Sequence, residues 1–238
     1  MKYLFFLGVV ICHSLAFARV TPTQINASQV KTISKKLSGV FATRTASAPT
    51  ALGEDFEFEI SAFYQDLESS GLTGFNSSVS DRFLDSLLTL KKGLYWNIDF
   101  SITTALPISS NLTSGFSFNL EHTSRIGSIV IKPDLYISNY NLNDIINMES
   151  VGLSLVAYKK FKILHIGLGA NVESTSSKYN VNFLENGLAP SESNETEFIE
   201  TSLISKVSSR LGALRFTATY LLRDKNSQLI SFAIGKRF

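Results

Sequence analysis

From residue 54 to the end of the chain, apolar and polar residues alternate with a period of two, which is the pattern of β-strands. In the clearest case, Phe56, Phe58, Ile60, Ala62 and Tyr64 alternate with mainly polar neighbours. Further alternating segments are centred on residues 84–90, 96–103, 112–121, 129–137, 151–157, 164–172, 199–207, 214–220 and 230–238. Segments of about ten residues match the length of a tilted strand that crosses a membrane. The pattern predicts ten strands, with eight or twelve as alternatives, and Pro133 predicts a bulge or interruption in the fifth.

The connections between these segments alternate in length. Short turns are expected at 92–93, 123–125, 159–162 and 208–212, and the other connections at 66–82, 105–111, 139–144, 175–196 and 223–228. Two of the latter, 66–82 and 175–196, are long and rich in Ser, Asn and Gly. Outer-membrane barrels have short turns on the periplasmic side and longer loops outside, and an even strand number returns both chain ends to one side. The connections therefore favour an up-and-down barrel over a soluble β-sandwich.

The residue types indicate which face meets lipid. The apolar set is rich in Phe, Ile and Leu, and its predicted membrane-facing members are Phe56, Phe58, Ile60, Trp96, Ile98, Phe100, Phe116, Phe118, Leu214, Phe216, Ile230, Phe232 and Ile234. The polar set consists mostly of small residues, which suit a crowded interior, and it carries a predicted lumen charge network of Glu57, Glu59, Asp99, Glu121, Lys132, Glu149, Glu200, Lys206, Arg215 and Arg237. An open sheet edge in hydrocarbon would leave backbone groups unpaired, so the last strand must pair with the first. The predicted fold is all-β: a closed antiparallel transmembrane β-barrel.

The N-terminal quarter of the chain follows different rules. Residues 1–18 carry a basic start, a short apolar core and an Ala-Phe-Ala cleavage site, which predicts a signal peptide; the apolar stretch is too short for an uncleaved membrane anchor. Between residues 21 and 40 the apolar spacing is three or four, which predicts one short amphipathic helix, and residues 41–53 have the composition of a linker. We therefore divide the chain into a signal peptide (1–18), a periplasmic helix and linker packed on or just below the barrel (19–53), and the barrel (54–238).

Composition removes several classes of function. The formal net charge is +2, and residues 1–18 contain Lys2 and no acidic residue, so no nucleic-acid partner is predicted. The single cysteine, Cys12, lies in the predicted signal peptide, which leaves neither a disulfide nor a cysteine metal site. His122 and His165 have no metal-ligand spacing, and no cofactor is predicted.

The C-terminal strand resembles the closing signal of bacterial outer-membrane proteins, an alternating apolar strand that ends on an aromatic residue. Ile230, Phe232, Ile234 and Phe238 match that signal, whereas Lys236 departs from it because its position is usually apolar. The resemblance implies export to the bacterial outer membrane, with membrane lipid and the outer-membrane assembly machinery as partners.

For function, the pattern favours a non-enzymatic protein, either structural or a narrow passive pore for small solutes. Glu57 and Glu59 are expected to lie at the depth of Arg215 and Arg237, either as a structural charge network or as the walls of a selective pore. An alternative is surface adhesion through loops 66–82 and 175–196, to an unspecified ligand. An outer-membrane lipid hydrolase using residues 122–124 (His-Thr-Ser) is disfavoured, because this segment is expected at the periplasmic end.

Overall fold

The protein is described by a computed structural model over residues 27–46, 48–66, 82–106, 113–142, 146–182, 191–224 and 227–238. The predicted signal peptide therefore lies outside the described residues, as do residues 67–81 of the first long connection. The elements in chain order are α2 (Ala27–Leu37), η1 (Ser38–Arg44), β1 (Phe56–Asp66), β2 (Arg82–Gly93), η3 (Tyr95–Asn97), β3 (Ile98–Leu106), β4 (Thr113–His122), β5 (Ser124–Ile126), β6 (Ile129–Leu142), β7 (Ile146–Phe161), β8 (Leu164–Asn182), β9 (Ser191–Leu211), β10 (Leu214–Asp224) and β11 (Ser227–Arg237).

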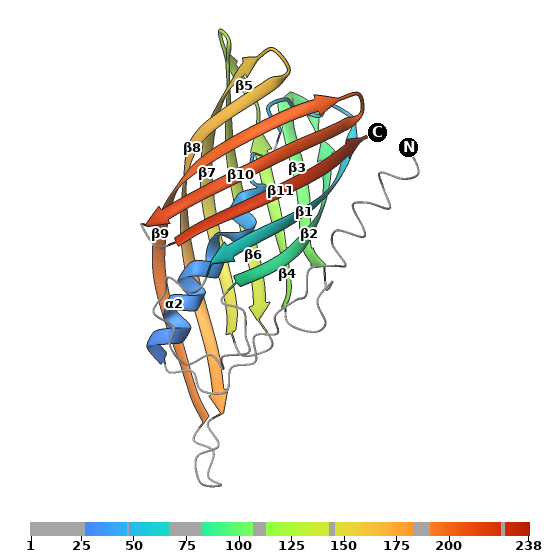
Figure 1. Ribbon diagram of the computed structural model, residues 1–238. Coiled ribbons are helices and arrows are strands. Elements are labelled where there is room, and N and C mark those ends of the chain that lie inside the picture. The colour runs from blue at the N-terminus through green and yellow to red at the C-terminus, as the bar shows by residue number, and fades with distance from the viewer. Residues whose placement is uncertain are drawn as a thin grey trace.

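The strands form one closed antiparallel barrel (Figure 1). Ten strands make the ring, and the short β5 continues the line of β4 beside β6. The ring closes between β1 and β11, where Ile60 lies opposite Ile234. The pairing partners can be followed once around the ring from Leu164 of β8. The path returns to β8 at Ser176 and not at Leu164, so each strand is shifted along its neighbour and the strands must tilt relative to the barrel axis. The predicted closed barrel and its closing strand are confirmed.

The two ends of the barrel differ. One end, the turn end, carries the connections 94–97, 127–128, 162–163 and 212–213, and lies at the top of Figure 1. At the opposite end, the loop end, β8 and β9 remain paired out to Asn182 and Ser191. The predicted loop 175–196 is therefore wrong over 175–182 and 191–196. These residues pair with each other as part of β8 and β9, and the ladder continues for three residues of β8 past Tyr179, the partner of Ile146 at the start of β7.

Two smaller predictions are also corrected. Pro133 does not end the fifth strand: β6 runs through it, and Pro133 lies beside the junction of β4 and β5, where the ladder is already interrupted. Trp96 is not on a membrane-facing strand, because β3 begins only at Ile98 and Trp96 lies in the η3 turn with a positive φ of 60°.

The end of α2 and all of η1 lie inside the barrel, which corrects the predicted position on or just below it. Leu37, Val40 and Phe41 are almost fully buried and join an apolar cluster with inward side chains of the strands. The Phe41 ring packs edge-on against Tyr140 of β6, with 5.9 Å between centroids. The helical spacing of apolar residues indicated that one face would be buried, but it did not specify the surface that buries it. No helix in the described part of the chain is long and apolar enough to cross a membrane.

Candidate functional site: a lumen occupied by the N-terminal segment

Residues 34–46 and 48–52, here called the plug, run through the barrel from the loop end to the turn end. At the loop end, the Ser34 hydroxyl lies 2.7 Å from that of Ser177 on β8. The Lys35 ammonium lies 3.2 Å from the Glu200 carboxylate on β9, and Arg223 of β10 donates a hydrogen bond to the Lys35 carbonyl. Side chains of three strands therefore hold the end of α2.

At mid-depth, one basic side chain of the plug pairs with the wall, and one basic side chain of the wall binds the plug backbone. The Arg44 guanidinium lies 3.1 Å from Oε1 of Glu59 on β1, and both side chains are buried. Three strands further round the ring, Lys206 of β9 donates hydrogen bonds to the carbonyl oxygens of Thr43, at 3.0 Å, and Thr45. The plug backbone is therefore the partner of a fully buried ammonium group.

The next contacts also join wall side chains to the plug backbone. The Ala46 amide donates to Oδ2 of Asp134 on β6 at 2.7 Å, and the Tyr158 hydroxyl of β7 donates to the Ala46 carbonyl at 2.5 Å. The Ser154 hydroxyl donates to Oγ1 of Thr45 at 2.9 Å. Both backbone groups of one residue are thus fixed by side chains from neighbouring strands.

At the turn end, the plug leaves the lumen and leads into β1. The Leu52 amide donates to Oδ1 of Asp99 on β3 at 3.0 Å, and its carbonyl accepts from Arg237 of β11 at 2.6 Å. Arg237 also pairs with Asp55 at 2.5 Å. Strands from both sides of the barrel closure thus hold the exit of the plug.

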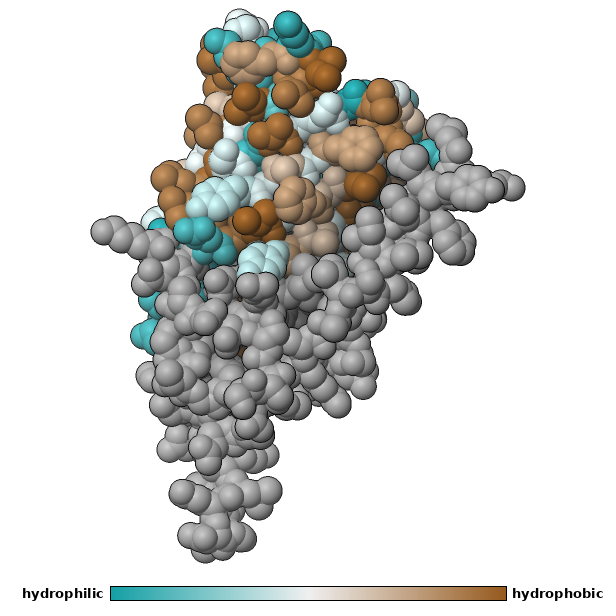
Figure 2. Space-filling view, in the orientation of Figure 1, coloured by the Kyte–Doolittle hydropathy of each residue, from teal (hydrophilic) through white to brown (hydrophobic). Residues whose placement is uncertain are grey.

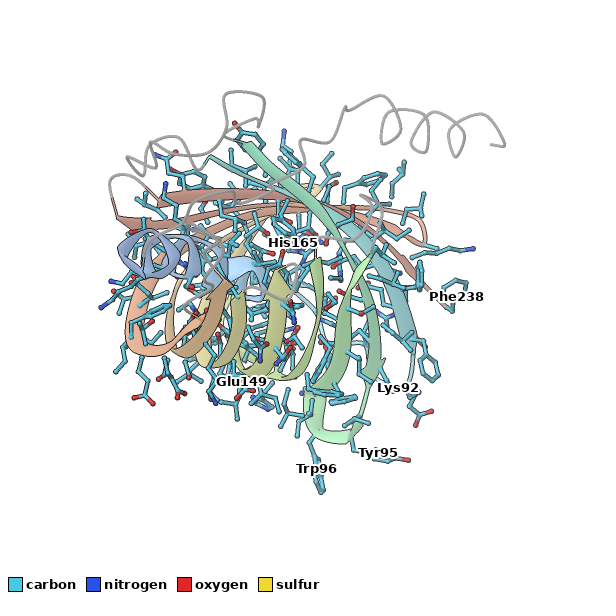
Figure 3. All side chains as sticks on the ribbon, turned by 90° about the horizontal axis from the view of Figure 1, so that it is seen from below. Lys92, Tyr95, Trp96, Glu149, His165 and Phe238 are labelled. Carbon is cyan, nitrogen blue, oxygen red and sulfur yellow. The ribbon has the colours of Figure 1, made fainter. Side chains whose placement is uncertain are left out.

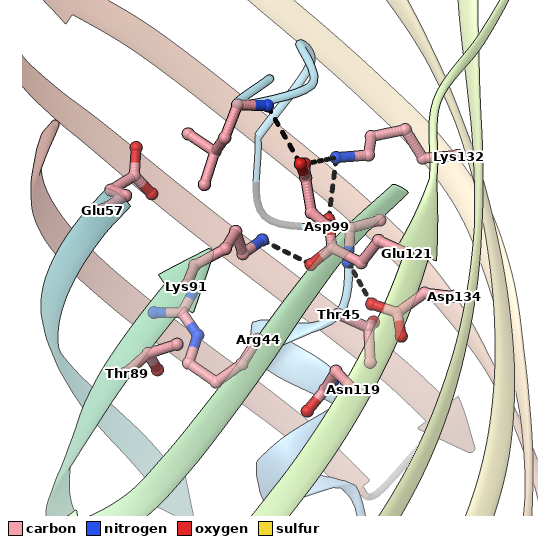
Figure 4. Close-up of polar contacts among 12 residues, drawn as sticks. Arg44, Thr45, Glu57, Thr89, Lys91, Asp99, Asn119, Glu121, Lys132 and Asp134 are labelled. Carbon is pink, nitrogen blue, oxygen red and sulfur yellow. Dashed lines mark hydrogen bonds and ion pairs between the residues drawn. The ribbon is translucent and has the colours of Figure 1, made fainter. Parts of the chain in front are cut away.

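The wall around the plug has ion-pair networks of its own (Figure 4). Glu121 of β4 accepts from Lys91 of β2 and, at 2.7 Å, from Lys132 of β6. Lys132 also lies 3.6 Å from Oδ2 of Asp99. All four side chains are buried, and their alternating charges offset the cost of removing them from water.

A second network lies across the barrel closure. Arg215 of β10 donates to Glu57 and, at 2.9 Å, to Glu59, both on β1. Glu59 therefore has two cationic partners, Arg215 from the wall and Arg44 from the plug.

The outward face has the opposite character. Leu153 and Phe232 are 56% and 64% exposed, whereas Glu121 and Lys132 are 1% and 0% exposed. Figure 2 shows apolar side chains spread over the visible strands. A closed barrel with charges inside and large apolar side chains outside is stable only where lipid surrounds it. The chain is an outer-membrane β-barrel protein.

Comparisons with known proteins are consistent with this class but do not decide it. No protein-family model matches the chain, and no curated protein matches it. Among solved structures, Neisserial surface protein A is 12% identical with a TM-score of 0.35, covering 77% of this chain and 95% of that one. Omp33 of Acinetobacter baumannii is 11% identical, with a TM-score of 0.37 over 79% and 100%. The β-domain of the Bordetella autotransporter BrkA is 11% identical, with a TM-score of 0.40 over 78% and 99%. Since these scores lie below 0.5, the class rests on the geometry of this barrel.

The structure places most of the predicted lumen charges on the inner face of this outer-membrane barrel. Those buried there are Glu57, Glu59, Asp99, Glu121, Lys132, Lys206 and Arg215. Glu200 and Arg237 are partly exposed near the two ends and pair with Lys35 and Asp55. Glu149 is a correction: it is exposed on the outer face that it shares with Val151 and Leu153, as Figure 3 also shows.

Several charged residues of the lumen were not predicted. Lys91, Asp134, Glu173 and Arg223 lie on the inward side of their strands, so the period-two rule applied to every charged residue would have found them. Arg44 carries no such signal, because it lies outside the alternating part of the chain.

The His-Thr-Ser segment lies at the turn end of the barrel. Nδ1 of His122 is 3.2 Å from the Ser124 hydroxyl, which is within hydrogen-bond distance. Within the described ranges, no carboxylate forms an ion pair with His122 to complete a catalytic triad. Nor do three His, Cys, Asp or Glu side chains gather there as a metal site could require.

Proposed function

We propose that this outer-membrane protein is a closed, non-enzymatic barrel whose plug prevents free diffusion through the lumen. The supporting observation is that buried wall groups have plug backbone atoms as partners: Lys206 donates to Thr43 and Thr45, and Asp134 accepts from Ala46. Without the plug, these groups would lose those partners at a cost of about 1–3 kcal/mol each. The plug is thus an integral part of the interior, and this favours the structural role over the narrow passive pore.

Conductance in planar bilayers tests this proposal. The chain with its plug should give no steady conductance, and a variant that lacks residues 27–52 should conduct, because a polar lumen would be left. Migration of unheated and heated samples on gels checks that each variant folds.

A second variant serves if the deletion does not fold. In Ser34→Cys/Ser177→Cys, a disulfide would tie the plug to β8 at a position where the two hydroxyls are already 2.7 Å apart. The oxidised and reduced forms should both be silent. A steady conductance of this variant that is the same in its oxidised and reduced forms would show that solutes pass beside the plug, and the proposal would be wrong.

The extended β8–β9 hairpin supports an accompanying role in surface contact. Its ladder continues past Tyr179, the last β8 residue paired with β7, to the pair Asn182 and Ser191. A rigid hairpin beyond the barrel can present its tip to a binding partner. Cells expressing a variant shortened by residues 180–193 should adhere less to a surface that native cells bind, with the barrel still folded; unchanged adhesion would exclude this role.

A further inference from the structure

The turn end of the barrel has unusually apolar tips. Tyr95, Trp96, Ile163 and Leu211 are 76%, 85%, 74% and 74% exposed, which places them among the most exposed large hydrophobic residues of the described chain. They come from three different turns. Figure 3 shows Tyr95 and Trp96 pointing away from the barrel. Aromatic residues in such positions favour the membrane–water interface over bulk water.

Basic residues accompany these tips in the sequence. Lys162 precedes Ile163, Arg210 precedes Leu211, and Arg125 precedes the exposed Ile126. All three cations are themselves exposed. Each of these turns therefore combines a side chain that prefers the interface with a cation that can reach the headgroups.

Three further lysines lie on the outer face just inside the turns, each over a phenylalanine ring. The Lys92 ammonium is 4.1 Å from the Phe56 ring centroid. The corresponding distance is 5.6 Å from Lys159 to Phe161 and 4.7 Å from Lys236 to Phe238. Lys92 also donates to the Glu54 carbonyl. Since an ammonium group has three donors and a ring uses none as a full hydrogen bond, each lysine retains donors for an oxygen ligand.

The charge of this end is positive. On the outside of this end the described carboxylates are Glu54 and Asp55, and Asp55 is already paired with Arg237. The other carboxylates at this depth, Glu57, Asp99 and Glu121, are buried in the lumen and paired with basic side chains there. The lysines and arginines named above outnumber the carboxylates on the outside. The ligand that complements a ring of cations at the level of apolar tips is an anion held at a membrane surface.

We propose that Lys92, Lys159 and Lys236, here called the lysine belt, bind the phosphate groups of anionic phospholipids in the leaflet that surrounds the turn end. The Phe rings and exposed turn residues fix the depth of this end, and the ammonium groups face the headgroup phosphates. The lysine belt lies outside the lumen, so the proposal does not depend on the plug.

The single tryptophan, Trp96, makes the proposal directly measurable, because it lies at the same end. The mature chain is folded into vesicles of phosphatidylcholine mixed with brominated phosphatidylglycerol, or with brominated phosphatidylcholine. Quenching of Trp96 fluorescence then gives the relative affinity for the two lipids. The native chain should prefer phosphatidylglycerol by about fivefold or more, since one basic residue near an anionic surface contributes that factor.

Matched variants isolate the lysine belt. K92Q/K159Q/K236Q should lose most of the preference, whereas K92R/K159R/K236R should keep it. Lys178→Gln, which removes an exposed lysine from the β8–β9 hairpin at the loop end, should leave it unchanged. The proposal is overturned if the native chain has no preference, or if the triple glutamine variant, folded by gel migration, retains the native value. In that case a protein partner becomes the better explanation of the apolar turns.

Discussion

At the scale of single residues, the interior depends on charges that are satisfied by specific partners. Glu121 is the clearest example, because it is the carboxylate that accepts from both Lys91 and Lys132. A buried ion pair adds little net stability over a well-packed apolar substitute, but loss of one partner leaves an uncompensated charge. The lumen should therefore tolerate few single substitutions at its charged positions.

Glu121→Gln should lower the free energy of unfolding by about 3–5 kcal/mol, because two buried ammonium groups lose their shared counter-charge. Glu149→Gln is the matched control, since Glu149 is exposed on the outer face, and it should change stability by less than about 0.5 kcal/mol. Guanidinium unfolding followed by Trp96 fluorescence measures both. Equal effects of the two substitutions would contradict the network.

At the scale of elements, neighbouring strands fit each other through tyrosines that lie over glycines. Tyr158 of β7 is paired across the ladder with Gly167 of β8, and Tyr136 of β6 with Gly152 of β7. A Cβ atom at Gly167 would come 2.5 Å from Cε1 of Tyr158, closer than non-bonded carbons approach. Glycine thus lets an aromatic ring lie flat on the inner wall and leaves space for the plug.

Gly167→Ala should therefore destabilise the barrel by about 1–3 kcal/mol, because the Tyr158 ring must move and its hydrogen bond to Ala46 is lost. Tyr158→Phe removes only that hydrogen bond and should cost about 0.5–1.5 kcal/mol. Urea or guanidinium titration of the folded barrel in vesicles compares the two. If the alanine variant proves as stable as the native chain, the close contact between the Tyr158 ring and position 167 is contradicted.

At the scale of the whole molecule, the direction of the plug determines the side of the membrane on which α2 begins. Contacts of the plug pass from Ser177 at the loop end, through Glu59, to Asp99 at the turn end. Because outer-membrane barrels have their short turns on the periplasmic side, we predict that α2 starts at the outer surface and that the chain runs inward through the lumen before β1.

Lys31→Cys should accordingly be labelled by a membrane-impermeant maleimide added to intact cells, because Lys31 is an exposed residue of α2 at the loop end. Asn97→Cys, in the η3 turn at the turn end, should be labelled only after the membrane is permeabilised. Both variants are made with Cys12→Ser so that each chain has one thiol. The reverse pattern would mean that the orientation of the barrel is inverted.

The sequence by itself determined the barrel and its faces. Alternation from Phe56 to Phe238 assigns each strand residue to one of two faces, and a lipid-exposed sheet must close, so β1 and β11 had to pair. The same parity could have assigned Lys91 and Asp134 inward and Glu149 outward. These features follow from the alternation of side chains along a single strand, which does not depend on the rest of the fold.

Only the tertiary structure decided what fills the barrel. The amphipathic pattern of the helix predicts that one side is buried. The surface that covers this segment is made of residues far apart in the chain, such as Glu59, Lys206 and Arg223. The length of β8 and β9 also depends on tertiary structure. Their ends are rich in Ser, Asn and Glu, a composition that predicts a loop, and they form strands because the two segments pair with each other. The plug and the hairpin depend on contacts between distant segments, and such contacts leave no periodic signal in either segment.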